Sequence, residues 1–322
     1  MVRVGHGWMS TSILFLVACA SACASSSSPD ATSATDDADA LVVEGSVGIA
    51  DERAIPKTEA GGTLLRVVAS NTTSGNGQSY DPGEGTRMLQ ALAPDVALVQ
   101  EFNYGSDSAE DIRSWVDTTF GSGFSYVREA SVQIPNGVVS RYPILESGSW
   151  RDSQVQNRGF AWARIDVPGP KDLWAVSLHL LTTGASTRRS EADQLVGYVR
   201  SRVPSGDYVV FGGDFNTGSR GEACITTFGA VVATKGPYPV DQRNNANTNA
   251  SRSKPYDWVL ASPNLDALAT PVAVGTNRFP AGLVLDSRVF APLADVAPVR
   301  ARDSAATNMQ HMPVVRDFVL PP

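Results

Sequence analysis

One short stretch constrains the fold of this chain more than any other. The apolar run YVVF at residues 208–211 is followed by GGDFN at residues 212–216. A run of β-branched and aromatic residues this short, stopped by glycines, is typical of a buried strand that ends in a turn. The two glycines also allow the backbone to turn tightly and to approach another group closely. We therefore expect a strand that presents Asp214 and Asn216 at its end.

These two polar residues are spaced so that they can act together. In extended backbone, residues two apart project from the same face, so Asp214 and Asn216 can point at one target. A carboxylate beside a carboxamide suits a metal-bound oxyanion or an attacking water. A polar turn that caps a strand is the alternative interpretation.

The same arrangement recurs along the chain. Asn71, Glu101 and His179 each follow an apolar run typical of a strand. Together with Asp214 and Asn216, they predict strands that deliver polar side chains to one rim of a sheet, where binding and catalytic sites tend to be built.

Helices are predicted between some of these strands. Apolar residues at helical spacing indicate helices over 86–93, 107–120 and 187–203, whereas 217–254 is predicted as a long loop. A helix between two strands on this scale implies that helices cover that face of the sheet. Further strands are predicted near 124–128, 136–140, 159–167, 256–261 and 311–319.

The N-terminus has the features of a bacterial targeting segment. Arg3 supplies the positive end, and the apolar run over 12–18 is too short to span a bilayer. The sequence LVAC resembles a lipobox in which Cys19 is lipidated, and Cys23 is a second candidate. An ordinary cleaved signal with incidental cysteines is the alternative. We expect a signal peptide with a lipobox over 1–23.

This reading places the protein at the bacterial cell envelope. A lipid on the cysteine would anchor the chain to a membrane, with the outer membrane favoured, on its periplasmic or its external side. If the lipobox is not used, the protein would be secreted. The third cysteine, Cys224, has no obvious partner, so the sequence does not indicate a disulfide framework.

Residues 24–62 are predicted to be a disordered acidic linker rich in Ser, Ala and Asp. Eight acidic residues stand against Arg53 and Lys57 there, so this segment carries −6 of the formal net charge of −7. With Arg3 in the signal, the folded domain over 63–322 carries about −2. Near-neutral charge argues against a protein that coats nucleic acid electrostatically. It does not exclude a polyanion that is bound through a metal.

The composition of the candidate site favours a hard cation. Of three histidines, His6 belongs to the signal, which leaves His179 and His311. A lone histidine beside a strand is more often structural than catalytic, but these two accompany acids at strand ends. No pair of His or Cys residues has the spacing of zinc ligands. Mg²⁺ fits better, since it takes one or two carboxylates, keeps waters and partners phosphate oxygens.

Seven motifs occur in a fixed order over residues 63–320. They are Asn71 after the first strand, Glu101 after the next, SRYP at 140–143, SLHL around His179, GGDFN at 212–216, YDWV around Asp257 and the closing HMPV at 311–314. In this order they resemble the endonuclease/exonuclease/phosphatase superfamily, which has the deoxyribonuclease-I-like fold. The GDFN motif followed by a closing HxPV is fairly specific.

The resemblance implies an α+β fold, a four-layer αββα sandwich of two packed, mostly antiparallel sheets flanked by helices. It implies that residues 63–322 form a phosphohydrolase domain that hydrolyses phosphate esters with a divalent metal. Mg²⁺ is the expected cofactor, with Mn²⁺ and Ca²⁺ as alternatives.

The resemblance also implies roles for individual residues. Glu101 would bind the metal with help from Asn71, and Asp214 and Asn216 would orient the attacking water and the phosphate. His311 would act as general base or polarise the phosphate, with Asp257 orienting its ring. His179 would bind or protonate phosphate oxygens. Arg158 is a candidate substrate-binding residue, and a surface ion pair is the alternative for it.

The chain departs from the family pattern before its last histidine. The family usually has Ser-Asp-His there, whereas this chain has Gln310 before His311. Gln310 can still donate an oxygen to a metal, but a neutral one. A second metal position and the metal affinity are therefore open.

Three classes of function follow. The leading expectation is a phosphodiesterase or nuclease, with sphingomyelin-type phospholipids or small phosphomonoesters as alternative substrates. A catalytically weak or inactive surface lipoprotein that uses the fold for binding is the second class, which Gln310 favours. A lipid-anchored structural protein would explain the linker but not the polar strand ends. Expected partners are the phosphate-ester substrate, nucleic acid or phospholipid, and the membrane; no protein partner can be inferred.

Overall fold

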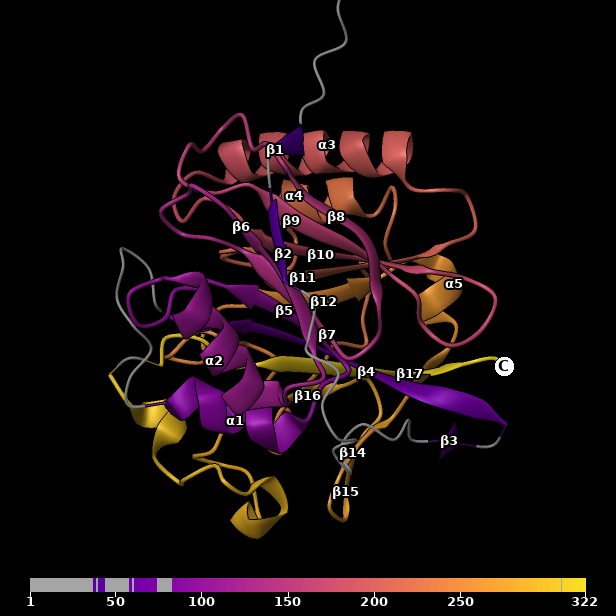
Figure 1. Ribbon diagram of the computed structural model, residues 1–322. Coiled ribbons are helices and arrows are strands. Elements are labelled where there is room, and N and C mark those ends of the chain that lie inside the picture. The colour runs from indigo at the N-terminus through magenta and orange to yellow at the C-terminus, as the bar shows by residue number, and fades with distance from the viewer. Residues whose placement is uncertain (1–36, 39, 44–57, 60, 74–82, 308) are drawn as a thin grey trace, which may run out of the picture. The chain divides into compact units, whose positions relative to one another are not determined.

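Two stacked β-sheets with helices on their outer faces form the folded part of the chain. The computed structural model describes residues 37–38, 40–43, 58–59, 61–73, 83–307 and 309–322, which belong to one compact unit, Asp36–Pro322. Helices α3 (Ala185–Arg202) and α4 (Ala223–Phe228) cover one sheet, and α1 (Glu84–Leu92) and α2 (Ala109–Phe120) cover the other (Figure 1). The order of layers is therefore αββα, and the predicted α+β sandwich is confirmed.

The sheet beneath α3 is mainly antiparallel. Its order is β1-β8-β9-β10-β11-β12, and only β10 and β11 pair in parallel within the described residues. The strands are β1 (Asp37–Ala38), β8 (Ile144–Trp150), β9 (Phe160–Ile165), β10 (Leu173–His179), β11 (Tyr208–Asp214) and β12 (Asp257–Ala261).

The second sheet follows the order β13-β17-β4-β5-β7-β6-β2, with β16 on β17 and β3 on β4. Only β4 and β5 pair in parallel among the described strands. The strands are β2 (Ala40–Val43), β3 (Thr58–Glu59), β4 (Gly62–Asn71), β5 (Val96–Gln100), β6 (Ser125–Glu129), β7 (Gly137–Ser140), β13 (Ala269–Thr270), β16 (Leu283–Val284) and β17 (Val314–Leu320). Smaller elements are the hairpin β14 (Val272–Val274) and β15 (Asn277–Phe279), helix α5 (Pro263–Asp266), and the 3₁₀ turns η2 (Leu293–Val296) and η3 (Asp303–Ala305).

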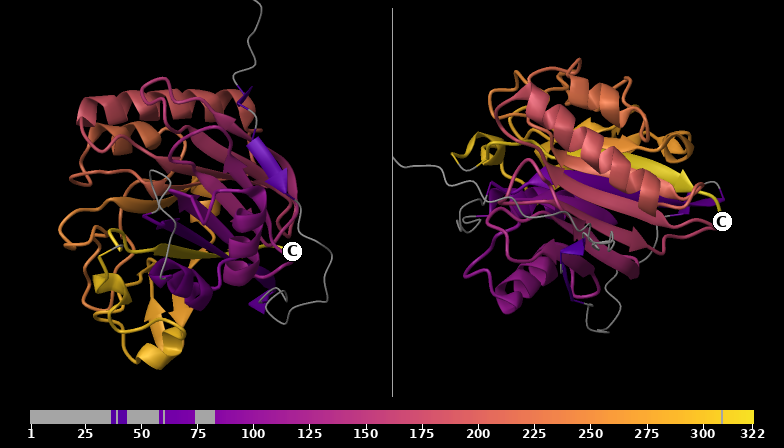
Figure 2. Two further views of the ribbon diagram at one scale, coloured as in Figure 1. Left: turned by 60° about the vertical axis from the view of Figure 1, so that its left-hand side comes forward. Right: turned by 90° about the horizontal axis from the view of Figure 1, so that it is seen from above.

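Each interface between layers has its own apolar core. Residues of α1 and α2, such as Leu89 and Trp115, pack on the outer face of the second sheet, and Leu195 of α3 packs on the outer face of the first. Between the sheets, Leu98 of β5 and Val210 of β11 belong to one buried cluster. Burial on both faces explains why these strands are continuous apolar runs in the sequence. The view from above shows α3 lying over the sheet, running in roughly the same direction as the strands that it covers (Figure 2).

The two glycines of the GGDFN motif lie in a strand and not in a turn, which corrects the expectation from the sequence. Strand β11 extends to Asp214. A Cβ atom on Gly212 would collide with Leu98 of the facing sheet, and one on Gly213 would collide with the carbonyl group of Leu178. The glycines therefore allow a close approach, as predicted: Gly212 to the facing sheet, and Gly213 to the neighbouring strand β10.

Most predicted elements are present, and the differences have simple causes. Strand β8 was not expected because Glu146, Ser147 and Gly148 interrupt its apolar pattern. Helix α4 is a short helix within the predicted loop 217–254. Three short stretches of the predicted linker pair as strands: β1 with β8, β2 with β6 and β3 with β4.

The predicted signal peptide and lipobox over 1–23 lie outside the described residues, as does the rest of the linker. Among the described residues, no helix has the length and apolar character that crossing a membrane requires. Cys224 is a buried free cysteine in α4.

Candidate active site

Strand direction and register bring the predicted site residues to one edge of the sandwich. Asn71, His179 and Asp214 are the last residues of β4, β10 and β11, and Glu101 follows β5 directly. His179 pairs in register with Asp214, and Asp214 pairs with Asp257, the first residue of the antiparallel strand β12. His311 precedes β17, which runs antiparallel to β4 and therefore begins at the same edge.

Asp214 is the centre of the cluster. Its Oδ2 accepts hydrogen bonds from the Nδ2 atoms of Asn71 and Asn216, both at 3.2 Å, and lies 3.3 Å from Nε2 of His179. The backbone N–H of Asn216 donates to Oδ1 at 2.9 Å. Only 2% of Asp214 is exposed. Burial, with a contribution from the nearby Asp257 carboxylate, raises the pKa of Asp214 to about 7.

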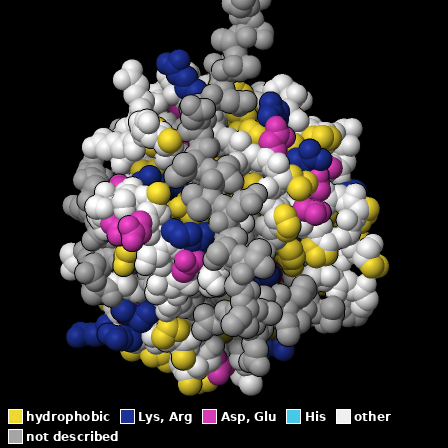
Figure 3. Space-filling view, viewed as in Figure 1, with side chains coloured by type: hydrophobic (Ala, Val, Ile, Leu, Met, Phe, Trp, Pro, Cys, Tyr) yellow, Lys and Arg dark blue, Asp and Glu magenta, His cyan; other side chains and the backbone are white. Residues whose placement is uncertain are grey.

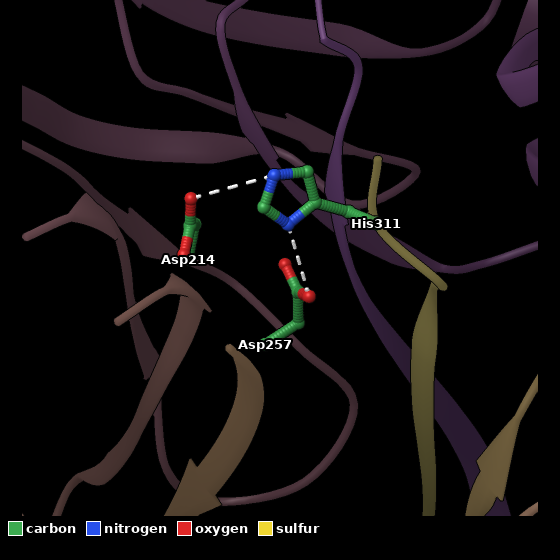
Figure 4. Close-up of side chains that lie close together, drawn as sticks. All are labelled: Asp214, Asp257 and His311. Atoms are coloured by element: carbon green, nitrogen blue, oxygen red, sulfur yellow. Dashed lines mark hydrogen bonds and ion pairs between the residues drawn. The ribbon is translucent and has the colours of Figure 1, made fainter. Parts of the chain in front are cut away.

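His311 lies between two carboxylates (Figure 4). Its Nδ1 is 3.1 Å from Oδ2 of Asp257, and its Nε2 is 3.7 Å from Oδ2 of Asp214. Burial opposes the charged ring, but Asp257, Asp214 and then Glu101 more than offset it and raise the pKa of His311 to about 10. His311 is therefore an imidazolium at neutral pH in the protein without a metal.

His179 has the opposite electrostatic character. Burial, followed by the charges of Arg158 and His311, lowers the pKa of His179 well below the usual value for histidine. Its Nδ1 is buried and has no hydrogen-bond partner in the protein. The site thus contains one charged and one neutral imidazole.

Glu101 lies at the partly exposed side of the cluster. Its Oε1 accepts from Nδ2 of Asn71 at 3.0 Å, and Oγ1 of Thr72 donates to its carbonyl oxygen at 2.7 Å. Glu101 has a φ of 54° and Asn216 a φ of 50°. Left-handed backbone costs little for Asn but is uncommon for Glu. Strain of this kind is concentrated at functional sites.

Arg158 is buried, and its partners are backbone carbonyl groups. Its Nε donates to the carbonyl oxygen of His179 at 2.7 Å and its Nη2 to that of Leu180 at 3.2 Å. Nη1 donates to Oδ1 of Asn157 at 3.3 Å. The surface ion pair expected as an alternative is wrong, because the guanidinium is buried and donates to the carbonyl oxygens of His179 and Leu180. Substrate binding by Arg158 stays a prediction.

Gln310 is the predicted residue that the structure does not bring into the cluster. Its side chain is exposed, whereas its neighbour His311 is buried. Two residues that the sequence did not single out lie close to the site. The ring of Tyr256 is 5.9 Å from that of His311, and Glu191 of α3 binds the backbone after His179. Its position directly before Asp257 is the sequence feature that could have identified Tyr256.

The donor groups of this edge fit a hard divalent cation. Asp214, Asp257 and His311 present ligand atoms that lie within 4.8 Å of one another. However, Nδ1 of His311 is already bonded to Asp257, so these two are better described as a His–Asp couple. Glu101 then supplies a carboxylate and Asn71 an amide, which are ligand types of Mg²⁺, and Asp214 lies beside Asn71. The three acids exceed the nearby positive charges of His311 and Arg158, so a cation would be stabilised here.

Fold and site together define a class: αββα sandwich proteins with carboxylates and a His–Asp couple at one edge of the sheets. The family model described as Endonuclease/Exonuclease/phosphatase family matches residues 85–275, which is more than half of the chain, and the protein belongs to this family. Members of the family are generally phosphoester hydrolases that use divalent metals.

Solved structures agree with this assignment. A family member from Bacteroides thetaiotaomicron is 16% identical, with 81% of this chain and 99% of that chain covered and a TM-score of 0.54. One from Beutenbergia cavernae is 17% identical, with coverages of 80% and 72% and a TM-score of 0.52. A humanized TDP2 of D. rerio is 17% identical, with coverages of 79% and 98% and a TM-score of 0.51. Identities this low establish the fold alone. A search of curated protein sequences found no match.

Proposed function

We propose that this protein is a divalent-cation-dependent phosphodiesterase. The contact network around Asp214 carries the proposal, because one buried carboxylate is shared by two amides and two imidazoles. A phosphodiester is anionic and repels hydroxide, so its hydrolysis needs neutralised charge and a positioned water. The cluster offers an imidazolium that can neutralise charge and polar side chains that can position a water.

The proton would be taken by Asp214. A carboxylate with a pKa of about 7 accepts a proton from water more readily at neutral pH than an ordinary aspartate does. The amide of Asn216 is held 3.2 Å from it and would orient the water or a phosphate oxygen. This assignment differs from the expectation that His311 is the base.

His311 would neutralise the phosphate. Its raised pKa keeps the ring protonated at neutral pH, and Asp257 holds Nδ1 so that Nε2 faces the reacting group. His179, which is neutral, would hydrogen-bond a phosphate oxygen. The two imidazoles would therefore have different tasks. Of the two, only His311 would contribute positive charge to neutralise the phosphate.

Glu101 and Asn71 would hold the cation, with Asp214 beside them. A bound Mg²⁺ supplies positive charge and Lewis acidity at the phosphate oxygens. Gln310 is left out of this set because its side chain is exposed. A single cation position at Glu101 is therefore the arrangement that we propose.

Phosphodiesters, including nucleic acid, are the substrate class that we favour, with phospholipids of the sphingomyelin type and phosphomonoesters as alternatives. On the face in Figure 3, described basic and acidic side chains are interspersed and no histidine is visible. A mixed surface does not favour sequence-independent coating of a polyanion. We also propose that the domain acts at the bacterial envelope, tethered through its N-terminal lipid.

The test is hydrolysis by the purified full chain. Substrates are bis(p-nitrophenyl) phosphate, plasmid DNA, RNA, sphingomyelin vesicles and p-nitrophenyl phosphate, each with Mg²⁺, Mn²⁺ or Ca²⁺ and then with EDTA. We expect turnover of at least one diester that EDTA abolishes. No turnover of any substrate with any ion would contradict the proposal and favour a binding protein.

A further inference from the structure

Two polar side chains of α3, Glu191 and Arg188, bind the backbone segment that follows β10. Both Oε atoms of Glu191 accept from the N–H of Leu181, at 3.0 and 3.1 Å. Nη1 of Arg188 donates to the carbonyl oxygens of Leu181 and Thr182 at 3.0 and 3.3 Å. Arg188 is fixed in turn by two hydrogen bonds of 2.9 Å to Glu222. The segment after His179 is therefore bound through both its N–H and its C=O groups.

The same backbone orients two residues of the candidate site. The carbonyl oxygen of Leu180 accepts from Nδ2 of Asn216 at 2.9 Å and from Nη2 of Arg158 at 3.2 Å. The N–H of Leu180 donates to the carbonyl oxygen of Asp214 at 2.9 Å. A shift of Leu180 would thus move the Asn216 amide, which also contacts Oδ2 of Asp214.

Glu191 is buried in a way that an ordinary surface helix residue is not. Its exposure is 0%, and it lies on the inward face of α3 with Ala192, Leu195 and Val199. Its carboxyl group is hydrogen-bonded to that of Asp152, which is also buried. Since an ionised carboxylate only accepts, such a pair must hold a proton. Burial, and then Asp152, raise the pKa of Glu191 to about 8, so the proton is retained at neutral pH.

We infer that Glu191 is a positioning residue: through the N–H of Leu181 it fixes the His179–Leu181 backbone, and thereby the orientation of Asn216 and Arg158. Glu191 also lies close enough to Arg158 for their charges to interact, which places it in the same buried polar network. Loss of its acceptor leaves the partly buried Leu181 N–H without a protein partner, which favours local opening of the segment. The inference extends the proposed function, because its kinetic consequence requires the phosphodiesterase activity.

The first test does not depend on activity. Amide hydrogen exchange of residues 179–184 is measured in the full chain without metal. Glu191→Ala should raise the exchange rate of this segment at least about tenfold, because one buried acceptor is lost. Glu191→Gln should keep wild-type protection, since Oε1 accepts from Leu181 and the amide N–H replaces the shared proton. Asp193→Ala, with a side chain that is 57% exposed on the same helix, is the control and should change nothing.

The second test is kinetic, with bis(p-nitrophenyl) phosphate and Mg²⁺. Glu191→Ala should lower kcat by about 10- to 100-fold with KM nearly unchanged, because misplacement by about 1 Å reduces turnover to this extent. Glu191→Gln should restore kcat. If the Ala variant does not fold, Glu191→Asp replaces it, since the shorter side chain withdraws the acceptor from Leu181 but keeps a carboxyl group.

The outcomes are distinct. Unchanged exchange in both Glu191→Ala and Glu191→Asp overturns the inference, and so does a Gln variant as defective as the Ala variant. Faster exchange with unchanged kcat shows that Asn216 and Arg158 do not depend on this segment, which also overturns it. If the wild type has no activity on any substrate, the proposed function fails, while hydrogen exchange still decides the positioning role.

Discussion

Strand β4 carries two buried polar clusters, and they differ in how completely their charges are compensated. In the middle of β4, Arg66 forms two hydrogen bonds to Asp317, from Nε at 2.8 Å and from Nη2 at 2.7 Å. Asp95 accepts from the Arg66 N–H at 2.7 Å and pairs with Arg141 at 2.9 Å. The remaining Arg66 donors reach backbone carbonyl groups. Each buried charge in this first cluster has a partner of opposite sign.

The cluster at the end of β4 is incomplete. Around Asn71, the acids Glu101, Asp214 and Asp257 share the positive charges of His311 and Arg158. Two buried atoms, Nδ1 of His179 and Oδ1 of Asp257, have no protein partner. Burying charged groups costs free energy in both places. The first cluster also has one buried atom without a partner, Nε of Arg141, but each of its charges is paired, which stabilises the fold. At the end of β4 the acids exceed the positive charges, which suits an added cation.

The largest effect is expected at the centre of the incomplete cluster. Asp214→Asn removes the proposed base, and turnover of bis(p-nitrophenyl) phosphate should fall by about 10²–10⁴-fold. Stability should be kept or raised, because burial raises the pKa of this carboxyl and the neutral amide avoids that cost. The measurements are kcat and the thermal midpoint of the metal-free protein. A variant that retains turnover within about threefold of wild type would remove Asp214 from the chemistry.

The complete cluster should respond in the opposite way. Asp317→Ala leaves the Arg66 guanidinium buried without its carboxylate, and the free energy of unfolding should drop by about 3–5 kcal/mol. The kcat of the folded fraction should stay at the wild-type value, because Asp317 is five pairing positions away from the end of β4. Urea unfolding and kinetics at low temperature measure the two quantities. A fall in kcat of the folded protein that accompanied the loss of stability would mean that the Arg66–Asp317 cluster influences the cluster around Asp214.

The cluster around Asp214 could be predicted in part from the sequence, because several of its residues lie at strand ends. Asn71, Glu101, His179 and Asp214 were predicted to meet because each ends an apolar strand, and parallel pairs place such ends at one edge. The meeting of these strand ends is a consequence of local pattern, which a single chain displays directly. The two-sheet sandwich, in contrast, was implied by the resemblance to the family and not by the strand pattern.

Long-range partners could not be predicted in this way. For Arg158, the sequence indicated substrate binding or a surface ion pair, because nothing near it in the sequence shows that it donates to the carbonyl groups of His179 and Leu180. Arg188 and Glu191 fall within the predicted helix 187–203, and their spacing to Ala192 and Leu195 fits its buried stripe. Only the fold shows which backbone groups these two side chains bind.

The pKa of His311 gives a pH-dependent test of the difference between the two clusters. Its folded pKa of about 10 lies above the usual 6.5, so its stabilising effect is complete below pH 6.5 and is lost as the pH rises through about 10. In the metal-free protein, NMR titration of the His311 ring should show this raised midpoint. Asp257→Asn should lower it by about 1–3 units, because an opposite charge in contact is lost.

Asp317→Asn is the matched control for that titration, since it neutralises a buried aspartate of the complete cluster. It should leave the His311 midpoint unchanged. An unshifted midpoint in Asp257→Asn would mean that the His–Asp couple does not set the charge of the ring. The proposed division between a charged His311 and a neutral His179 would then be wrong.

The smallest effect is expected at Gln310, and it defines where the incomplete cluster ends. Because its side chain is exposed beside the buried His311, Gln310→Ala should change Mg²⁺ affinity and kcat by less than about twofold, as for surface substitutions generally. Glu101→Gln, which replaces a proposed carboxylate ligand by a neutral oxygen, should weaken Mg²⁺ binding by at least about tenfold. Calorimetric titration with Mg²⁺ compares the two variants. If Gln310→Ala weakened binding as much as Glu101→Gln, the cation would have to lie between these residues, and a single position at Glu101 would no longer describe the site.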